Sequence, residues 1–437
     1  MDPLIVGYLG LLAMTVLIVL GMRVAFATAL IGILGIAFLK GWGAALGTAG
    51  YLPHGIVAHY GLSVIPLFII MGYFAYFAGL TKDVFGTARQ WFGHLSGGLA
   101  IASTYGCAGF AACTGSSVAS AAVMGKLAIP EMRKYGYQPR LAAGAIAAGG
   151  TIATLIPPSV PLVIFGIITE QSVGHLLMAG FLPGILSAII YALMIQIRVK
   201  INPFLAPPLP AASWKARLIS LKDIWGILVL LALILGGLYT GIFTPSEAGG
   251  AGATGTFLMA LFAGKLKWSN FRECVLDTGK ATIMIFAIIV GVLIFVRFLA
   301  ITGLPIAFSR AVVALPAPRL IILLGILGIF VFLGMFLDLI GMMLLALPIV
   351  FPVVVALGFD PIWFGVIVVK MGEICLITPP VGLNVYVVGS VAPDIPSEEI
   401  FMGIIPFLFM DFLTLAVLIM FPQISLFLPS IMLTGLV

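Results

Sequence analysis

Hydrophobic residues follow one another in long runs along this chain, and polar residues gather in short segments between the runs. A helix needs about 20 apolar residues to cross the hydrocarbon core of a bilayer, and eight runs reach or approach that length. They cover residues 3–22, 24–39, 64–80, 175–197, 224–242, 248–264, 281–300 and 400–428. The pattern predicts an all-α polytopic membrane protein without a soluble domain of useful size.

The composition agrees with this prediction. Charged residues make up 8% of the 437 positions and hydrophobic residues 62%, with a mean hydropathy of +1.27, whereas soluble domains contain about 25% charged residues. No basic segment precedes the first run, and a second run follows Arg23, so we interpret the first run as a retained helix rather than a signal peptide. The four cysteines lie in or beside apolar segments and are expected to be buried free thiols.

Two segments interrupt the apolar pattern in the same way. Residues 136–158 align without a gap with residues 358–380, which lie 222 positions further along (358 − 136 = 222). Both copies end in a Pro-Pro pair, and proline breaks a helix because it lacks an amide hydrogen and clashes with the preceding turn. An interrupted helix at membrane depth is tolerated only beside protein or a watery cavity. We therefore predict two broken helices, at about 139–169 and 361–391.

A turn of small or polar residues precedes each predicted break. Residues 113–120 are small and hydroxyl residues within an uncharged stretch, and residues 334–341 surround Asp338 in the second copy. Such clusters turn a chain, so we predict two re-entrant helical hairpins, at about 96–129 and 319–352. Two ordinary packed helices are the alternative, because Gly, Ala and Ser also favour close helix contacts. The shared spacing favours hairpins.

Basic residues predict the orientation of the chain. The connection 198–223 carries five Lys or Arg residues against one acid, and a second basic loop follows at 265–280; both are expected in the cytoplasm. The run 64–80 then ends inside whereas the run 281–300 starts inside, which predicts inverted repeats and two termini on the outer side. The net charge of +6 is spread over several loops, so a nucleic-acid partner is not expected.

This topology predicts a division of the chain into a scaffold and two repeats. The expected parts are N-terminal scaffold helices in 1–63, the first repeat in 64–197, a cytoplasmic loop with a connecting scaffold helix pair in 198–280, the second repeat in 281–428 and a C-terminal tail in 429–437. Paired, interrupted segments in two repeats are typical of the binding site of a secondary transporter.

The broken helices suggest cation chemistry. A break releases backbone carbonyls, and these form, together with hydroxyls and a carboxylate from a facing turn, an oxygen cage that suits a hard cation such as sodium. Helix N-termini at the breaks would favour an anionic substrate. The alternative is a proline kink that only shapes packing, but two symmetric breaks favour a functional role. Asp338 is the strongest candidate, because an acid within apolar sequence indicates function; a role as a helix cap would not exclude cation binding.

Other charged residues suggest structural roles. Lys370 and Glu373 are spaced i, i+3, which favours a salt bridge over a proton relay. Asp411 lies alone in the last run, and the sequence does not identify a basic partner for it. Arg297 could bind a substrate carboxylate or extend to lipid headgroups.

Enzymatic functions find no support in the sequence. The histidines lack the spacing of zinc ligands, and no base lies near Ser116 or Ser117 in the sequence to activate a nucleophile. No phosphate-binding loop of the Walker type occurs. We therefore expect neither an enzyme nor a cofactor, and the driving force must come from an ion gradient or a partner.

The residues around the turns and breaks resemble those of one family. The matching pieces are, in chain order, Gly115-Ser116-Ser117, Ile129-Pro130-Glu131-Met132, Tyr135-Gly136-Tyr137, residues 142–151, Leu155-Ile156-Pro157-Pro158-Ser159 and Thr378-Pro379-Pro380-Val381-Gly382-Leu383-Asn384. They resemble the large membrane subunit of tripartite ATP-independent periplasmic (TRAP) transporters, which belong to the ion transporter superfamily of elevator carriers. The resemblance covers essentially the whole chain.

This resemblance implies a mechanism and partners. A scaffold would hold a moving transport domain that carries both hairpins. A small four-helix membrane subunit would lie alongside, and a soluble periplasmic substrate-binding protein would deliver an organic acid that enters with sodium. The location would be the inner (cytoplasmic) membrane of a bacterium or archaeon.

The resemblance also implies roles for individual residues. A first sodium site would use Thr114 and Ser116 with backbone oxygens of Ala153, Ile156 and Pro158. A second would use Asp338 and Thr378 with carbonyls of Cys375 and Val381. Ser117, Ser159 and Asn384 are the expected substrate-binding residues. The family usually has Gly where Ala153 stands, so the methyl group of Ala153 could tighten the first break without removing its carbonyl.

Three other interpretations of the function are possible. A stand-alone ion-coupled anion carrier of the same superfamily is the first, since the absence of the small subunit from this chain is equally compatible with it. A scaffold subunit without transport activity is disfavoured, because it gains nothing from two costly helix breaks, and an intramembrane enzyme comes last. The sequence does not identify the organic acid, the sodium stoichiometry or the oligomeric state.

Overall fold

The computed structural model describes residues 2–432, which form helices and no strands. The predicted all-α class is therefore confirmed for this part of the chain. The α-helices are α1 (Pro3–Val19), α2 (Val24–Lys40), α3 (Trp42–Val57), α4 (Val64–Ala78), α5 (Leu80–Phe92), α6 (Gly98–Thr114), α7 (Ser117–Lys134), α8 (Pro139–Thr151), α9 (Val160–Thr169), α10 (Val173–Ile201), α11 (Trp214–Ser220), α12 (Trp225–Tyr239), α13 (Pro245–Phe262), α14 (Trp268–Thr302), α15 (Leu304–Val313), α16 (Arg319–Gly334), α17 (Leu339–Ala356), α18 (Pro361–Ile377), α19 (Leu383–Val391), α20 (Ser397–Met420) and α21 (Gln423–Ser430). Short 3-10 helices cover Tyr60–Ser63 (η1), Ile152–Thr154 (η2) and Pro203–Leu205 (η3).

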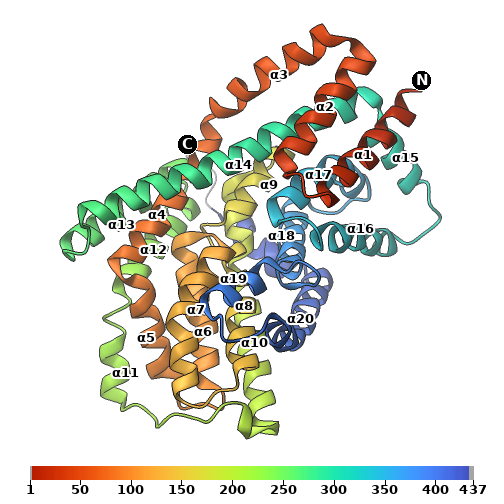
Figure 1. Cartoon of the computed structure of the whole chain (residues 1–437). Coiled ribbons are helices and arrows are strands. Elements are labelled where there is room, and N and C mark those ends of the chain that lie inside the picture. The colour runs from red at the N-terminus through yellow and green to blue at the C-terminus, as the bar shows by residue number, and fades with distance from the viewer. Residues whose placement is uncertain (1, 433–437) are drawn as a thin grey trace.

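The helices pack in two groups. In one group the long helix α14 crosses the molecule and packs against α2 and α4, while α13 packs against α4 and α12 (Figure 1). In the other group α8 contacts α6, α7 and α20, and α18 contacts α16, α17 and α20. The two groups meet where α4 contacts α6 and where α14 and α15 contact α17.

The two halves of the chain repeat one order of elements. In each half a helix ends at a glycine in the left-handed conformation, Gly79 (φ 86°) after α4 and Gly303 (φ 72°) after α14, and a new helix begins directly afterwards. A helical pair follows, formed by α6 and α7 or by α16 and α17, and then a broken helix. The duplication inferred from the sequence thus extends to the local structure, whereas the opposite orientation of the repeats stays a prediction.

The broken helices have the expected bounds. The first runs from α8 through η2 to α9 (139–169) and the second from α18 to α19 (361–391). The helical pairs are longer than expected, because α7 continues to Lys134 and α17 to Ala356. Each pair turns at one short connection, as the hairpin prediction requires.

Several apolar runs differ from the helices that contain them. The run 281–300 is the last part of α14, which begins at Trp268, so the boundary expected at 280 falls inside this helix. The boundary expected at 197 likewise falls inside α10. The run 400–428 forms two helices, α20 and α21, because the chain leaves helical geometry at Phe421 and Pro422 follows it. Of the expected tail, 429–430 belong to α21, and 433–437 lie outside the described residues.

Length and composition identify the helices that could span a membrane. Within the described residues five helical segments qualify, namely 60–78, α10, α14, α17 and α20, and the bent pair of α11 and α12 could form a sixth. The helix α17 is one arm of the second hairpin and has 18 residues. Its length suffices for a span, so whether this hairpin re-enters the membrane stays a prediction.

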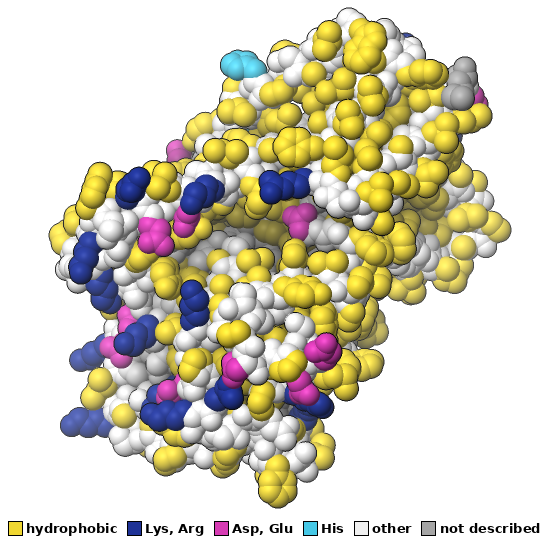
Figure 2. Space-filling view, viewed as in Figure 1, with side chains coloured by type: hydrophobic (Ala, Val, Ile, Leu, Met, Phe, Trp, Pro, Cys, Tyr) yellow, Lys and Arg dark blue, Asp and Glu magenta, His cyan; other side chains and the backbone are white. Residues whose placement is uncertain are grey.

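The two basic loops lie against neighbouring helices, α4 and α5. Lys265 donates at 2.8 Å to the carbonyl of Ala78, the last residue of α4. In the other loop, the Ser220 carbonyl accepts from Thr87 at 2.8 Å and the Arg217 carbonyl from Trp91 at 3.2 Å. Figure 2 shows Lys and Arg over the region of α5, α11 and α13, whereas the surface over α1–α3 is largely hydrophobic. This arrangement fits the expectation that both loops face the same side of the membrane.

The cysteines behave as predicted. All four, Cys107, Cys113, Cys274 and Cys375, are free and buried. Histidine, cysteine and acidic residues form no group of three or more that could hold a metal ion within the described part of the chain.

Candidate ion site at the helix breaks

The first break lies against the tip of the first hairpin. The chain leaves helical geometry after η2, and Ser159 begins α9 by accepting a hydrogen bond from the Leu162 amide at 3.3 Å. Gly115, at the tip, has a left-handed backbone (φ 56°), and a Cβ added to it would lie 2.1 Å from the Pro158 carbonyl oxygen. The structure thus brings the Pro158 carbonyl to the tip between Thr114 and Ser116.

The side chains of the first tip are engaged locally. The Thr114 hydroxyl lies 3.3 Å from the Phe110 carbonyl and 3.3 Å from the Ser120 hydroxyl. Ser116 caps α7 by accepting from the Ala119 amide at 3.4 Å. Ala153 and Ile156, whose carbonyls were expected to complete the site, are buried in the same break. Hydroxyl and carbonyl oxygens of this kind suit a hard monovalent cation.

The second break lies against the second hairpin through Cys375. Its side chain packs so tightly on Gly334 that a Cβ there would lie 2.0 Å from the sulfur, and the thiol donates to the Phe330 carbonyl at 3.5 Å. The carbonyl of Cys375 accepts from the Thr378 amide at 3.3 Å. Thr378 also donates through its hydroxyl to the Ile374 carbonyl at 2.6 Å, and Val381 is half-buried beyond the break.

Asp338 occupies the same structural position as Ser116. It caps α17 by accepting from the Gly341 amide at 3.3 Å, three residues ahead, just as Ser116 caps α7. The next residue, Leu339, packs on Gly372 of α18, while Ser117, next to Ser116, packs on Gly150 of α8. Each tip therefore contacts the helix that leads into its own break at the equivalent glycine, and the second tip adds a carboxylate.

The two breaks differ in their exposure. All residues from Thr151 to Val160 are buried, whereas Pro379 and Pro380 in the second break are exposed. The sequence gives no sign of this difference, because both breaks have the same Pro-Pro pattern. It depends on the helices that cover the first break, among them α10, where a Cβ on Gly180 would lie 2.4 Å from the Leu155 carbonyl oxygen.

Two of the three expected substrate-binding residues meet across the repeats. Asn384, at the start of α19, donates to the Ser117 hydroxyl at 2.7 Å and to the Ala147 carbonyl at 3.0 Å. The third, Ser159, is separate from them, caps α9 and donates to the Thr154 carbonyl. All three side chains are buried, so in this structure they connect parts of the fold.

Replacing Asn384 by Ala is expected to lower the free energy of unfolding by about 1–3 kcal/mol, because the Ser117 hydroxyl loses a buried hydrogen-bond partner. Thermal unfolding in detergent measures this change. Ser390→Ala is a matched control, since Ser390 lies on the same helix, is exposed and bonds only within its own turn. Equal unfolding temperatures for the two variants would show that the contact between Asn384 and Ser117 does not stabilise the fold.

A buried cluster of charges lies behind the first break. Lys370 donates to Glu373 at 2.6 Å and to Asp411 at 2.7 Å, and all three side chains have no exposed surface. The predicted salt bridge between Lys370 and Glu373 is thus confirmed, and Lys370 is the basic partner of Asp411 that the sequence did not identify. Glu373 also accepts from the Thr154 hydroxyl at 2.9 Å, which connects the second broken helix to the first break.

Two polar residues that no sequence pattern singled out complete this cluster. Tyr191 of α10 donates to Asp411 at 2.6 Å, and Ser187, one turn earlier, accepts from Lys370 at 3.1 Å. The only signal in the sequence was the presence of three isolated charges in apolar runs, and their meeting depends on the packing of α10, α18 and α20. Arg297, the other charged candidate, is exposed on α14.

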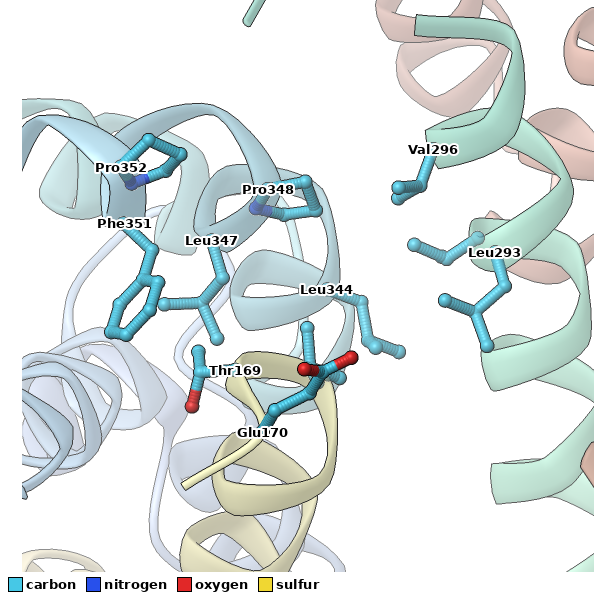
Figure 3. A pocket seen from close by; sticks show the side chains of 11 residues that line it. Thr169, Glu170, Leu293, Val296, Leu344, Leu347, Pro348, Phe351 and Pro352 are labelled. Atoms are coloured by element: carbon cyan, nitrogen blue, oxygen red, sulfur yellow. The ribbon is translucent and has the colours of Figure 1, made fainter. Parts of the chain in front are cut away.

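A cavity of about 280 Å³ lies elsewhere, between the two groups of helices. Figure 3 shows Leu344 and Pro348 of α17 opposite Leu293 and Val296 of α14, with Glu170 at the end of α9 beside them. The lining is largely apolar and carries the carboxylate of Glu170, which would repel an anion. The cavity is therefore unsuited to an organic acid and marks a loosely packed contact between the groups.

Comparisons with known proteins connect this arrangement with transport. The family model for the DctM component of the tripartite ATP-independent periplasmic transporter matches residues 11–424. The chain is 36% identical to the C4-dicarboxylate TRAP transporter large permease protein DctM of Pseudomonas aeruginosa, over 85% of this chain and 87% of that protein. It is 32% identical to the sialic acid TRAP transporter large permease protein SiaM of Vibrio cholerae, over 98% of each chain.

A solved structure shares the fold. The crystal structure of the YdaH transporter of Alcanivorax borkumensis superposes with a TM-score of 0.60 and covers 90% of this chain and 89% of that one. The sequence identity is 16%, so the likeness concerns the fold alone.

Proposed function

We propose a function for this chain from the premise that it belongs to the family of the DctM component of tripartite ATP-independent periplasmic transporters. Its relatives are named as large permease subunits of transporters. The chain would be the transport-domain subunit of a sodium-coupled importer, which moves an organic acid across the inner membrane by an elevator motion. Its large permease role follows from the family; the coupling ion, the motion and the substrate class are the proposal.

The main support for sodium coupling is that a hairpin tip contacts a broken helix in each of the two repeats. At the first break, Gly115 holds the Pro158 carbonyl against the hydroxyl residues Thr114 and Ser116. At the second, Asp338 caps the hairpin helix whose next residue packs on Gly372. Oxygen donors at two such places fit two sodium ions. Carrying one cation across 100 mV supplies about 2.3 kcal/mol, so two cations would support strong accumulation.

The two groups of helices support an elevator motion. One group contains α14 with α2 and α4, and the other contains both hairpin pairs and both broken helices. The largely apolar cavity between α14 and α17 lies at their contact. An apolar contact can slide without breaking buried polar bonds, because dispersion contacts have little directionality. The second group would carry ions and substrate past the first.

Relatives suggest the substrate class and the partners. The two named above carry C4-dicarboxylate and sialic acid, both of which are carboxylates, so we propose an organic acid here. A tripartite transporter with a large permease requires a small membrane subunit and a periplasmic substrate-binding protein. The helix N-termini at Ser159 and Gly382 would favour the substrate's negative charge, with Ser117, Ser159 and Asn384 nearest to it once the breaks move apart.

Both termini are proposed to face the periplasm. The basic loop around Lys265 lies against the end of α4 and the one around Arg217 against α5, and their charge assigns both to the cytoplasm. If each apolar run before and after these loops is one crossing, both ends of the chain would lie outside.

Uptake into proteoliposomes tests the proposal. The chain is co-reconstituted with the small subunit and a binding protein loaded with a candidate carboxylate, and an inward sodium gradient is compared with potassium. We expect accumulation only with sodium and only when all three components are present. Sodium-driven uptake that persists without the binding protein would favour a stand-alone carrier instead. Absence of uptake from folded, complete preparations across the carboxylates tested would favour a scaffold subunit.

A further inference from the structure

The cavity between the two groups of helices is large enough to bind an apolar molecule. Its volume is about 280 Å³, whereas an apolar cavity of about 150 Å³ already binds benzene. Its wall combines α14 from the first group with α9 and α17 from the second, and Figure 3 shows Leu293 opposite Leu344 and Pro348. Such a wall stabilises a hydrocarbon chain by dispersion contacts and by removing apolar surface from water.

The lining carries one charged group, the carboxylate of Glu170. The other polar residue of the lining, Thr169, donates its hydroxyl to the Phe165 carbonyl at 2.7 Å and is thereby satisfied within α9. Glu170 is exposed and belongs to none of the ion pairs among residues 2–432, and Arg297, which follows the lining residue Val296 on α14, is not paired with it. An apolar wall beside an unpaired carboxylate favours a ligand that combines an apolar chain with a positive charge.

The backbone at Glu170 is also unusual. With φ 56° it is the one non-glycine residue in a left-handed conformation within the described part of the chain. It ends α9, where its amide and that of Gln171 both donate to the Gly166 carbonyl. Glycine is the usual residue at such a helix end, and a larger side chain there costs strain, which is found most often at functional sites.

The second repeat does not share this feature. The residue 222 positions after Glu170 is Ala392 (170 + 222 = 392), which follows α19 with φ −132° and carries no charge. The repeated architecture therefore does not itself require a carboxylate at the end of this helix. The charge at Glu170 belongs to the cavity rather than to the repeat.

We propose that this cavity is a binding site for a small cationic amphiphile, in which an apolar chain lies between α14 and α17 and an ammonium group pairs with Glu170. Figure 3 shows the Glu170 side chain beside Leu344, so a chain in contact with Leu344 would place its head group at this carboxylate. An ammonium donates charge-assisted hydrogen bonds to a carboxylate. The volume, about twice that of a cavity that binds benzene, suits an alkylammonium or arylalkylammonium with a short chain.

A ligand in this cavity would contact both groups of helices at once. Leu293 and Val296 belong to α14, whereas Leu344 and Glu170 belong to the group that contains the hairpins and the broken helices. A ligand that fits one arrangement of two bodies stabilises that arrangement, so it would oppose an elevator motion. This consequence rests on the proposed function, whereas binding itself does not.

Calorimetric titration of the purified full chain in detergent tests the proposal. The probes are hexylammonium and hexan-1-ol, which have the same chain and differ in the charge of the head group. Partitioning into micelles is not saturable and is common to all variants, so saturable binding reports the cavity. We expect the wild type to bind both probes, and hexylammonium about fivefold more tightly, as an ion pair with an exposed carboxylate allows.

Two substitutions of Glu170 test the role of its charge. Glu170→Gln keeps the length of the side chain, and Glu170→Asn introduces a residue that adopts the left-handed conformation more readily and should therefore fold. Both variants should still bind the alcohol and should lose the preference for the ammonium. Glu398→Gln is the matched control, since Glu398 is exposed in the first turn of α20 and does not line the cavity. It should keep the preference of the wild type.

Val296→Phe tests the place of the chain. Val296 is half-buried and lines the cavity, so a larger side chain there should fill the space and remove saturable binding of both probes. If this variant does not fold, the substitutions of Glu170 still decide the question. The proposal would be overturned by a wild type without saturable binding, by an unchanged ammonium preference in Glu170→Gln and Glu170→Asn, or by undiminished binding to folded Val296→Phe.

Discussion

Asp338→Asn is expected to weaken sodium-driven uptake strongly while leaving the chain folded. Asp338 caps α17 by accepting from the Gly341 amide, and asparagine caps a helix about as well as aspartate. The substitution thus removes the negative charge and keeps the cap. A contact with a charged group contributes about 1.5–3 kcal/mol, and 1.4 kcal/mol corresponds to a tenfold change in affinity. Sodium affinity should therefore fall by about 10- to 150-fold, which a sodium titration of uptake measures.

Asp360→Asn provides the control for this experiment. Asp360 caps α18 in the same way, accepting from the Ile362 and Trp363 amides at 2.8 and 2.9 Å, but it is exposed and distant in sequence from either break. Its replacement should leave the sodium titration unchanged. If Asp338→Asn retained the sodium dependence of the wild type, Asp338 would be a helix cap and the second site would lose its carboxylate.

Gly115→Ala should have the largest effect on the first site. A Cβ at this position would lie 2.1 Å from the Pro158 carbonyl oxygen, and that atom belongs to the backbone of the break, so a side-chain rotation cannot relieve the clash. The left-handed backbone at φ 56° adds about 1–2 kcal/mol of strain for alanine. Overpacking of this kind costs about 1–3 kcal/mol more. We expect unfolding at a lower temperature and loss of sodium-driven uptake.

Gly358→Ala is a control for Gly115→Ala, because it introduces the backbone strain of a left-handed residue without a steric clash of the added Cβ. Gly358 has a similar backbone angle, φ 76°, but a Cβ there would meet nothing within 4 Å. This variant should show the strain alone, with a smaller fall in unfolding temperature and normal uptake. Comparable losses of uptake in the two variants would mean that contact between the first tip and the first break is not needed for transport.

Local rules determined much of this structure in advance. A Pro-Pro pair removes two successive amide donors and breaks a helix, so the two pairs placed the breaks inside 139–169 and 361–391, the bounds of the broken helices in the structure. Single prolines, such as Pro130 in α7 and Pro183 in α10, lie inside continuous helices. Small and capping residues turn the chain at the hairpin tips, where Ser116 and Asp338 begin α7 and α17. The 222-residue repeat related these positions before any contact was known. Such features depend on residues close together in the sequence.

The helix ends within long apolar runs were less predictable. Hydrophobicity does not show where α14 begins. The helix starts thirteen residues before the apolar run at 281, within a polar segment. It also does not show the break between α20 and α21. No side-chain capping hydrogen bond marks the start of α14 at Lys267 or of α21 at Pro422, and an apolar window averages over the residues at which a helix begins.

Only the tertiary structure decided which of the isolated charges pair with one another and which of the two breaks is buried. The sequence showed Lys370, Glu373 and Asp411 as separate charges, and the packing of α18 on α20 and α10 brought them together with Tyr191 in one buried cluster. It also buried the first break and left Pro379 and Pro380 exposed. The physical reason is that a local pattern fixes the direction of the chain over a few residues. Burial and the pairing of charges depend instead on helices that are far apart in the chain, such as those of Tyr191 and Asp411, which are 220 positions apart.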